Sequence, residues 1–267
     1  MDAPARLVLL GHPVAHSISP RFQNAALQAA GIPLVYAALD VAPAQLDATL
    51  AMLATERAAG NVTIPYKEAV AARCARRSPL AERCGAVNTF WHENGVLVGD
   101  NSDVGGAESV LRALLGNALA GARIALVGAG GAAASILCAA ERCGAAEVRV
   151  YNRTMPRAQN LAHRFAPMAR ATARMDVALI DADLVVNATP IGLHDDEFPV
   201  PIDRLPPGSA VFDLIYRAHE TPWVRAARAA GHRATDGEGM LMEQGAIAFE
   251  RWFGFEPDRR VMWQSLH

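Results

Sequence analysis

Proteins that bind nucleic acids typically contain a block of basic residues, and this sequence has none. Its 267 residues include 25 Lys and Arg against 27 Asp and Glu, which leaves a formal net charge of −2. It also lacks a membrane span, because the charge-free run at 124–140 is mostly Gly and Ala and falls short of the ~20 strongly apolar residues required. Only a short apolar run, 7–10, lies near Asp2, so no signal peptide is expected. We therefore expect neither nucleic acid nor a membrane among its partners.

Cysteines are few, and histidines are not spaced for metal binding. The four cysteines contain no C-x-x-C pair, which predicts reduced thiols in a cytoplasmic protein. His12 and His16 are close in sequence, but Pro13 between them disfavours a shared helical face. The acidic run 195–197 is interpreted as a solvated loop. We therefore expect no metal site.

Strand-like and helix-like segments alternate along the chain, and 52% of the residues are hydrophobic, enough for a substantial core. The expected strands are 7–10, 34–41, 61–64, 124–127, 148–151, 184–187 and 211–214, with a hairpin formed by 88–91 and 96–98. The expected helices are one that begins with Ser19 as N-cap and ends at Gly31, one that begins at Pro43, and others at 67–76, 103–115 and, after a loop, within 237–254. This alternation predicts an α/β protein with parallel sheets.

A dinucleotide-binding pattern lies in the middle of the chain. The strand 124–127 leads into Gly128-Ala129-Gly130-Gly131-Ala132-Ala133, which fits G-x-G-x-x-A and opens an Ala-rich helix. The glycines allow a tight turn and close approach of the backbone to a pyrophosphate, and the helix N-terminus offers free N–H groups. More than 100 residues precede this loop, enough for a separate domain.

A basic cluster follows the second strand of this pattern. It consists of Asn152-Arg153-Thr154, with Arg157 one turn further. Proteins that bind NAD usually carry an acidic residue at this place for the ribose 2′-hydroxyl, whereas a cation suits a 2′-phosphate. The sequence therefore predicts NADP as the cofactor.

Polar clusters follow several expected strands in the first part of the chain. They occupy 16–20, 63–67, 85–89 and 99–103. Because ligands gather beyond the carboxyl ends of parallel strands, the hydroxyls, the amides, the lysine and the aspartates of these clusters predict a cup for a small polyhydroxylated molecule. Taken singly, each has a simpler explanation: Ser19 and Asp103 as helix N-caps, and Lys67 as a solvated helix residue.

Together these clusters resemble the shikimate dehydrogenase family over nearly the whole chain. In the first half the matching segments are G-H-P-V-A-H-S-I-S-P at 11–20, N-V-T-I-P-Y-K at 61–67, G-A-V-N-T at 85–89 and D-N-S-D at 100–103. In the second half they are G-A-G-G-A at 128–132, N-R-T at 152–154, N-A-T-P-I-G at 187–192, D-L-I-Y at 213–216 and G-M-L-x-x-Q-G-A at 239–246. Each segment is modest alone, but their common order makes the resemblance specific.

The resemblance implies reversible reduction of 3-dehydroshikimate to shikimate by NADPH, in the route to aromatic amino acids. Lys67 and Asp103 would be the catalytic pair. The residues implied at the substrate are Ser17 and Ser19 for its carboxylate, and Thr63, Asn88, Tyr216 and Gln244 around its ring and hydroxyls. The residues implied at the cofactor are Gly128, Ala129, Gly130, Gly131, Ala132, Asn152, Arg153, Thr154 and Arg157, with Leu214 and Gly237 beside the nicotinamide.

The implied fold has two α/β domains. Residues 1–115 would form the substrate-binding and catalytic domain, and residues 116–237 a Rossmann NADP-binding domain. Residues 238–267 would form a C-terminal helical segment that packs toward the first domain. We expect a cytoplasmic monomer or homodimer.

Three positions depart from the commonest family pattern. Gln23 stands where many members have His, Ser102 replaces Thr, and Ala218 replaces a frequent Pro. Gln recurs at the first position in relatives that accept both quinate and shikimate, so a quinate/shikimate dehydrogenase is one alternative. A catalytically silent NADP-binding sensor or scaffold is another, against which the presence of Lys67 and Asp103 speaks.

Overall fold

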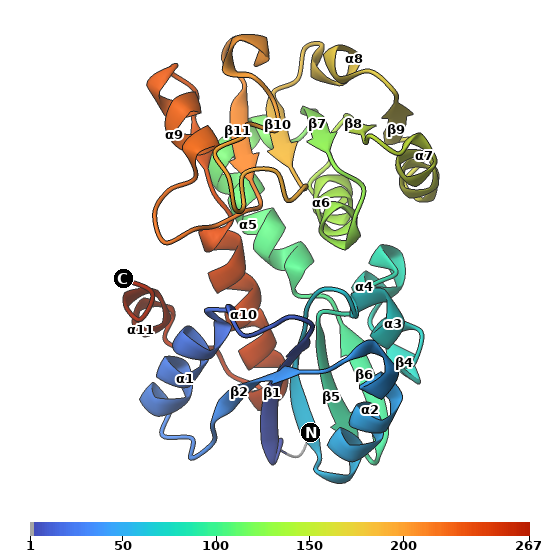
Figure 1. Cartoon of the computed structure of the whole chain (residues 1–267), viewed down its shortest axis with the longest axis vertical. Coiled ribbons are helices and arrows are strands. Elements are labelled where there is room, and N and C mark those ends of the chain that lie inside the picture. Colours follow the sequence, from blue (N-terminus) through green and yellow to red (C-terminus); the bar gives the residue numbers. More distant parts are fainter. Residues whose placement is uncertain (1–2) are drawn as a thin grey trace. The chain divides into compact units, whose positions relative to one another are not determined.

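The computed structural model describes residues 3–267 and divides the chain into two compact units. One contains the residues up to Gly106 together with Leu241–His267, and the other contains Ala107–Met240. Each unit is built on a six-stranded sheet with helices (Figure 1). The chain passes from one unit to the other inside two helices, α5 (Asp103–Leu115) and α10 (Glu238–Phe253).

The first unit contains a mixed sheet of order β2-β1-β3-β5-β6-β4. Its strands are β1 (Arg6–Gly11), β2 (Tyr36–Asp40), β3 (Ala58–Val62), β4 (Arg76–Arg77), β5 (Thr89–Glu93) and β6 (Val96–Asp100). β1, β2 and β3 are parallel, whereas β5 is antiparallel to both β3 and β6. The predicted hairpin is therefore confirmed. Its turn residues Asn94 and Gly95 have positive φ values of 52° and 76°, as the tight turns that suit hairpins require.

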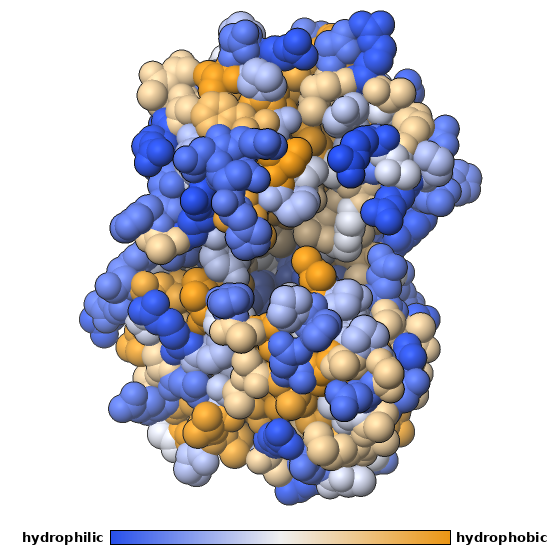
Figure 2. Space-filling view, in the orientation of Figure 1, coloured by the Kyte–Doolittle hydropathy of each residue, from blue (hydrophilic) through white to orange (hydrophobic). Residues whose placement is uncertain are grey.

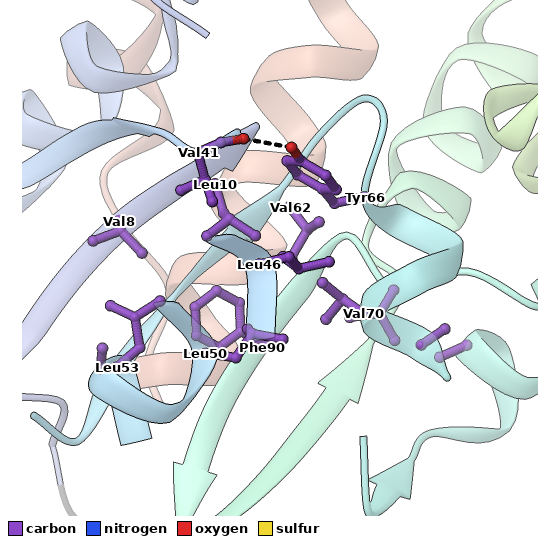
Figure 3. Close-up of a cluster of buried hydrophobic side chains, with 14 residues drawn as sticks. Val8, Leu10, Val41, Leu46, Leu50, Leu53, Val62, Tyr66, Val70 and Phe90 are labelled. Carbon is purple, nitrogen blue, oxygen red and sulfur yellow. Dashed lines mark hydrogen bonds between the residues drawn. The ribbon is translucent and has the colours of Figure 1, made fainter. Parts of the chain in front are cut away.

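Both faces of this sheet are buried, because successive side chains of β1 point to opposite faces. Val8 and Leu10 pack on one face, which α2 (Leu46–Thr55) covers through Leu46, Leu50 and Leu53 (Figure 3). On the other face, Leu7 and Leu9 share a core with side chains of α1 (Ser19–Ala29) and α10, namely Phe22, Phe249 and Trp252. The predicted return of the last long helix to the first domain is therefore confirmed. The remaining helices of this unit are α3 (Lys67–Ala71), α4 (Pro79–Cys84), α11 (Arg259–Gln264) and the 3-10 turn Pro43–Gln45.

The second unit contains a fully parallel sheet of order β12-β11-β10-β7-β8-β9. Its strands are β7 (Arg123–Val127), β8 (Glu147–Tyr151), β9 (Ala169–Thr172), β10 (Leu184–Asn187), β11 (Ala210–Asp213) and β12 (Ala234–Thr235). Its helices besides α5 are α6 (Gly131–Arg142), α7 (Met155–Arg164), α8 (Met175–Leu179) and α9 (Pro222–Ala229). The strand order is that of a Rossmann fold, with its reversal between β7 and β10, where such folds bind dinucleotides.

The start of α1 differs from the expectation. Ser19 is not the N-cap but already belongs to the helix, and the cap position is Ile18, which makes no side-chain capping bond. The preceding backbone is already turned, since Ser17 N donates to Val14 O and Arg21 N to Ile18 O. Pro at the start of the helix is confirmed, but the explanation of Ser19 as a helix cap is wrong.

Two boundaries near Lys67 also differ. The strand expected at 61–64 begins earlier, at Ala58, because Gly60 lies so close to β1 that an added Cβ would be 1.9 Å from Val8 O. The helix expected at 67–76 ends at Ala71, because the chain then returns to the sheet. Arg76 pairs there with Val98 and forms the edge strand β4.

Candidate functional site

Lys67 and Asp103 form an ion pair at the starts of two helices. Lys67 is the first residue of α3 and the only lysine in the sequence, and Asp103 is the first residue of α5. Lys67 Nζ lies 2.6 Å from Asp103 Oδ2, and the side chains are 18% and 9% exposed. The backbone of Lys67 is held as well, because its carbonyl accepts a hydrogen bond from Val87 N at 2.9 Å. The structure thus brings together the two residues that the sequence analysis paired.

Asn88 holds the other oxygen of Asp103. Asn88 Nδ2 donates to Asp103 Oδ1 at 2.7 Å, and Asn88 Oδ1 accepts from Ser102 N at 2.7 Å. Asn88 is only 2% exposed, so both bonds are shielded from water. Gln244 reaches the same group from α10, with Oε1 3.3 Å from Asn88 Nδ2. Four of the predicted residues therefore form one hydrogen-bonded cluster.

Ser17, Ser19 and Thr63 follow the carboxyl ends of β1 and β3, which are parallel neighbours. Ser17 Oγ accepts from Ser19 N at 3.3 Å. Thr63 N donates to Leu10 O at 2.8 Å, which keeps the Thr63 backbone beside β1. In residues 3–267 none of these three hydroxyls is hydrogen-bonded to the Lys67–Asp103 cluster. Their approach to a common ligand stays a prediction.

The glycine loop of the second unit has the geometry of an anion cradle. Gly128 has φ of +116°, and an added Cβ would lie 2.6 Å from Ala188 O, so only glycine fits. Gly130 is the N-cap of α6, with no side-chain capping bond, and a Cβ on Gly130 or Gly131 would meet nothing within 4 Å. The first N–H groups of α6 are therefore left for a ligand, and the open space accommodates a pyrophosphate.

The basic cluster lies where β8 passes into α7. Asn152 Nδ2 donates to Thr154 O at 2.9 Å, which closes the turn. Arg153 and Arg157 are exposed and make no ion pair within the described part of the chain. By contrast, the exposed Arg174 of the same unit pairs with Asp176. Two cations at the end of β8 fit the 2′-phosphate of an NADP ribose.

Leu214 and Gly237 are in direct contact. An added Cβ on Gly237 would lie 2.2 Å from Leu214 O, and Gly237 N donates to Ile215 O at 2.9 Å. The structure thus brings together the two residues implied at the nicotinamide. Tyr216, implied at the substrate ring, follows on the same turn of the second unit, and burial raises the pKa of its phenol.

Family models match most of the chain. Residues 9–90 match the shikimate dehydrogenase substrate binding domain, residues 110–192 match shikimate/quinate 5-dehydrogenase, and residues 237–267 match the shikimate 5′-dehydrogenase C-terminal domain. A shikimate dehydrogenase (NADP(+)) from Mesorhizobium japonicum is 42% identical over 262 residues, which span 96% of this chain and 93% of that protein. The chain belongs to the shikimate dehydrogenase family.

Solved structures of the shikimate dehydrogenase family have the same fold. The enzyme from Aquifex aeolicus superposes with a TM-score of 0.92 at 31% identity, covering 100% of this chain and 99% of that one. The enzyme from Thermus thermophilus, in complex with NADP(H) and shikimate, superposes with a TM-score of 0.89 at 39% identity, covering 98% of both chains. The predicted family and its two-domain α/β fold are therefore confirmed.

Gln23, which departs from the common family pattern, is 1% exposed in α1. Its Nε2 donates to Gly245 O at 2.9 Å, next to Gln244, and no group within residues 3–267 donates a hydrogen bond to its Oε1. A buried amide oxygen without a donor is costly, so a ligand hydroxyl or water would be bound favourably there.

Other classes of site find no support in residues 3–267. No group of His, Cys, Asp and Glu is arranged to hold a metal, and no helix is long and apolar enough to cross a membrane. Large exposed hydrophobic side chains, such as Val35, Ile64 and Phe255, are dispersed along the sequence. Figure 2 shows hydrophobic and hydrophilic residues interspersed on the visible face. Exposure of a single hydrophobic side chain is ordinary and does not by itself indicate a binding surface.

The sequence analysis named the segments that contain Asp100 and Asp213 but did not predict the partners of these two carboxylates. Arg251 binds Asp100, a residue far away in sequence, and Asp213 is buried among Asn187, Ile215 and Thr221. Neither shows a spacing signal, because tertiary packing alone brings the partners together.

Proposed function

We propose that the protein catalyses the reversible, NADPH-dependent reduction of 3-dehydroshikimate to shikimate, in the route to chorismate and the aromatic amino acids. The observation that carries the proposal is the Lys67–Asp103 pair, joined at 2.6 Å and held by Asn88. An ammonium beside a carboxylate can donate a proton to a ketone oxygen as that oxygen becomes negative. The relatives that match nearly the whole chain are named for this reaction.

Lys67 and Asp103 have different roles in the proton transfer. NADPH, when bound, supplies the hydride that reaches the carbonyl carbon. Lys67 Nζ donates a proton to the carbonyl oxygen, and Asp103 Oδ2 orients the ammonium and shares the proton relay. Asn88 keeps Asp103 Oδ1 in place, so the carboxylate cannot rotate away from Lys67. In the oxidative direction Lys67 takes the proton back from the shikimate hydroxyl.

The substrate is held by hydroxyl and amide groups. Ser17 and Ser19 bind the carboxylate of shikimate from the start of α1, where the helix dipole favours an anion. The ring and its hydroxyls are bound by Thr63, Asn88, Tyr216 and Gln244. Neutral donors and acceptors of this kind suit a small polyhydroxylated acid.

The cofactor is held by the second unit. The loop Gly128–Ala132 and the N-terminus of α6 bind the pyrophosphate, and Leu214 and Gly237 contact the nicotinamide. The 2′-phosphate is bound by the basic cluster of Asn152, Arg153, Thr154 and Arg157. A planar guanidinium binds phosphate with two parallel hydrogen bonds, which supports a preference for NADP over NAD.

We propose residues 1–115 as the substrate-binding and catalytic domain and residues 116–237 as the NADP-binding domain, with 238–267 serving the first. The compact units of the structure change over slightly elsewhere, between Gly106 and Ala107 in α5 and between Met240 and Leu241 in α10. We place the enzyme in the cytoplasm as a monomer or homodimer. All four cysteines lie in the described residues and are free thiols, which agrees with a reducing compartment.

The test is an absorbance assay at 340 nm with purified protein, shikimate and NADP⁺. NADPH formation that depends on shikimate is expected, with far slower turnover of NAD⁺. Quinate is tested as a second substrate in the same assay. Gln23, with its unpaired side-chain oxygen, supports as the alternative a quinate/shikimate dehydrogenase of broader substrate specificity. Equal turnover of quinate would establish that alternative, and no turnover of either acid would indicate a silent NADP-binding protein.

A further inference from the structure

A buried carboxylate, Asp100, lies beside the proposed catalytic group. It is the last residue of β6 and comes shortly before Asp103 in the chain. The Asp100 side chain is 5% exposed, yet donors reach both of its oxygens. Because a buried carboxylate without donors is costly, the donors to Asp100 must keep their positions around it in the folded protein.

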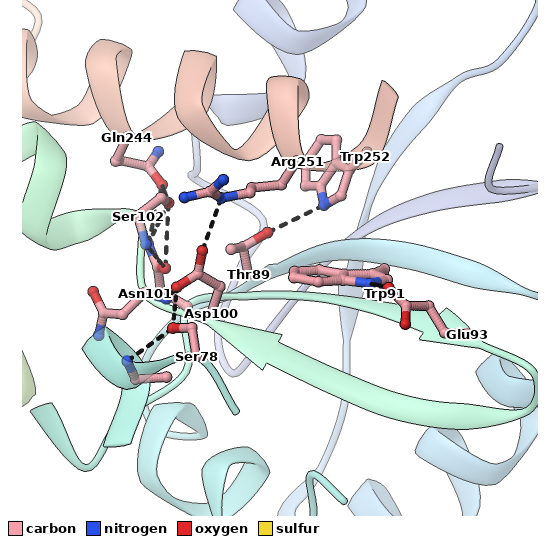
Figure 4. Close-up of polar contacts among 12 residues, drawn as sticks. Ser78, Thr89, Trp91, Glu93, Asp100, Asn101, Ser102, Gln244, Arg251 and Trp252 are labelled. Atoms are coloured by element: carbon pink, nitrogen blue, oxygen red, sulfur yellow. Dashed lines mark hydrogen bonds and ion pairs between the residues drawn. The ribbon is translucent and has the colours of Figure 1, made fainter. Parts of the chain in front are cut away.

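Asp100 connects three segments of the first unit (Figure 4). Its Oδ1 accepts from Ser78 Oγ and from Asn101 N, the latter at 2.7 Å. Ser78 is also the N-cap of α4, where its Oγ accepts from Ala81 N at 3.1 Å. On the other side, Oδ2 accepts from Arg251 Nε at 2.9 Å, and Arg251 belongs to α10.

The bond to Arg251 fixes the helix that presents Gln244. Gln244 and Arg251 are seven residues apart in α10, so two helical turns place them on the same face. Gln244 Oε1 lies 3.3 Å from Asn88 Nδ2 and 3.4 Å from Ser102 Oγ. A shift of α10 along or about its axis would therefore move Gln244 away from the cluster.

Asp100 also holds Asn88, which directly precedes β5. Asn88 N donates to Asp100 O at 3.1 Å, while Asn88 Nδ2 donates to Asp103 Oδ1 at 2.7 Å. The neighbouring Asn101 N donates to the Asp100 carboxylate, which fixes the backbone that leads to Asp103. Asp100 thus constrains both sides of the Asn88–Asp103 contact, the Asn88 side through its backbone carbonyl and the Asp103 side through its carboxylate.

We propose that the Asp100–Arg251 ion pair is a positioning device for this active site. It holds Gln244 and Asp103 where they meet substrate and Lys67, and neither Asp100 nor Arg251 contacts substrate itself. The proposal rests on the function proposed above for Lys67, Asp103 and Gln244. Displacement of a reacting group by about 1 Å can cost on the order of a hundredfold in rate, so a distant ion pair can matter this much.

The test compares Arg251→Met with Arg6→Met. Arg251→Met takes the donor from Asp100 Oδ2 and is expected to lower stability, but Asp100 keeps the donors Ser78 and Asn101 on Oδ1. Arg6→Met is the control because it removes an ion pair with Glu56 in the same unit. Arg251→Met is expected to lower kcat/KM for shikimate about ten- to a hundredfold while KM for NADP⁺ stays unchanged. Arg251→Lys, which keeps a cation, should recover most of the loss. Arg6→Met should leave both constants unchanged.

Equal kinetic effects of Arg251→Met and Arg6→Met, or none from either, would overturn the proposal. So would a parallel rise in KM for NADP⁺, which would show that the change is not confined to the substrate side of the site. Denaturation in urea separates stability from kinetics, since a structural role alone would lower the midpoint and leave kcat/KM intact.

A second measurement does not require activity. Lys67 is the only lysine, so its acetylation by acetic anhydride is followed on one peptide by mass spectrometry. Arg251→Met should speed this reaction, because a displaced Asp103 holds the ammonium less firmly, whereas Arg6→Met should not. An unchanged rate would refute the positioning of Asp103. If the wild-type protein fails to oxidise shikimate, the proposed function falls, and this measurement still decides the role of the ion pair.

Discussion

Replacement of Lys67 by Met tests the proposed proton donor and separates its chemical role from its structural one. Met keeps most of the aliphatic stem, which is largely buried, and removes only the amine. Loss of a general acid lowers kcat by about 10²–10⁴-fold. NADP⁺ affinity should stay unchanged, because the residues proposed to bind the cofactor belong to the other unit.

The structure also predicts a loss of stability. Without Lys67, no side chain of residues 3–267 donates to Asp103 Oδ2, and the 9% exposed carboxylate keeps Asn88 on its other oxygen. Leaving such a group unsatisfied costs about 1–3 kcal/mol, which urea denaturation can measure. The double variant Lys67→Met/Asp103→Asn removes the stranded charge, so it should regain stability and remain inactive. A folded Lys67→Met protein with near-normal turnover, or a double variant that regains activity together with stability, would refute the reasoning.

Three other predictions concern binding and thiol chemistry. Arg153→Ala should weaken NADP⁺ binding about ten- to a hundredfold, because each charge-assisted hydrogen bond contributes roughly 1.5–3 kcal/mol. NAD⁺ binding should barely change, and Arg174→Ala serves as the control. If Arg153→Ala leaves the ratio of kcat/KM for NADP⁺ to kcat/KM for NAD⁺ at the wild-type value, Arg153 does not bind the 2′-phosphate. The double variant Ser17→Ala/Ser19→Ala should weaken shikimate binding in calorimetry and leave NADP⁺ binding intact; equal shikimate affinity would contradict the carboxylate assignment. Burial raises the pKa of Cys74 to about 11. At pH 8 its thiolate fraction is therefore about two hundredfold below that of an ordinary cysteine, and alkylation followed by mass spectrometry should accelerate about tenfold per pH unit up to pH 10. A plateau at lower pH would contradict this.

Motifs near strand ends made much of the site predictable. Lys67 and Asp103 are 36 residues apart, yet both follow sheet strands, and the shared edge of those strands brings them together. The glycine loop was also predictable, because Gly128 must lie against Ala188 O, where no side chain fits. Local sequence suffices when a backbone constraint or a strand end determines where a residue lies.

Contacts between distant segments could not be predicted. Arg251 and Asp100 are 151 residues apart, and nothing in either neighbourhood marks the other. Ser19 looked like a helix cap because Pro20 follows it, but the backbone before it was already turned. The helix α11 was not predicted, because it has only six residues, too few to show a helical repeat of hydrophobic positions after its N-cap Asp258. In each case the outcome depends on packing that a local pattern does not contain.

The discontinuous first unit has a consequence for synthesis on the ribosome. Its sheet is complete once β6 has emerged, but the face that bears Leu7 and Leu9 is covered by Phe249 and Trp252. Those residues are translated only after the whole of Ala107–Met240. The nascent chain must therefore carry an uncovered hydrophobic face while the entire nucleotide-binding unit is made, a state that attracts chaperones and favours aggregation. The second unit, continuous in sequence, can finish folding before the first.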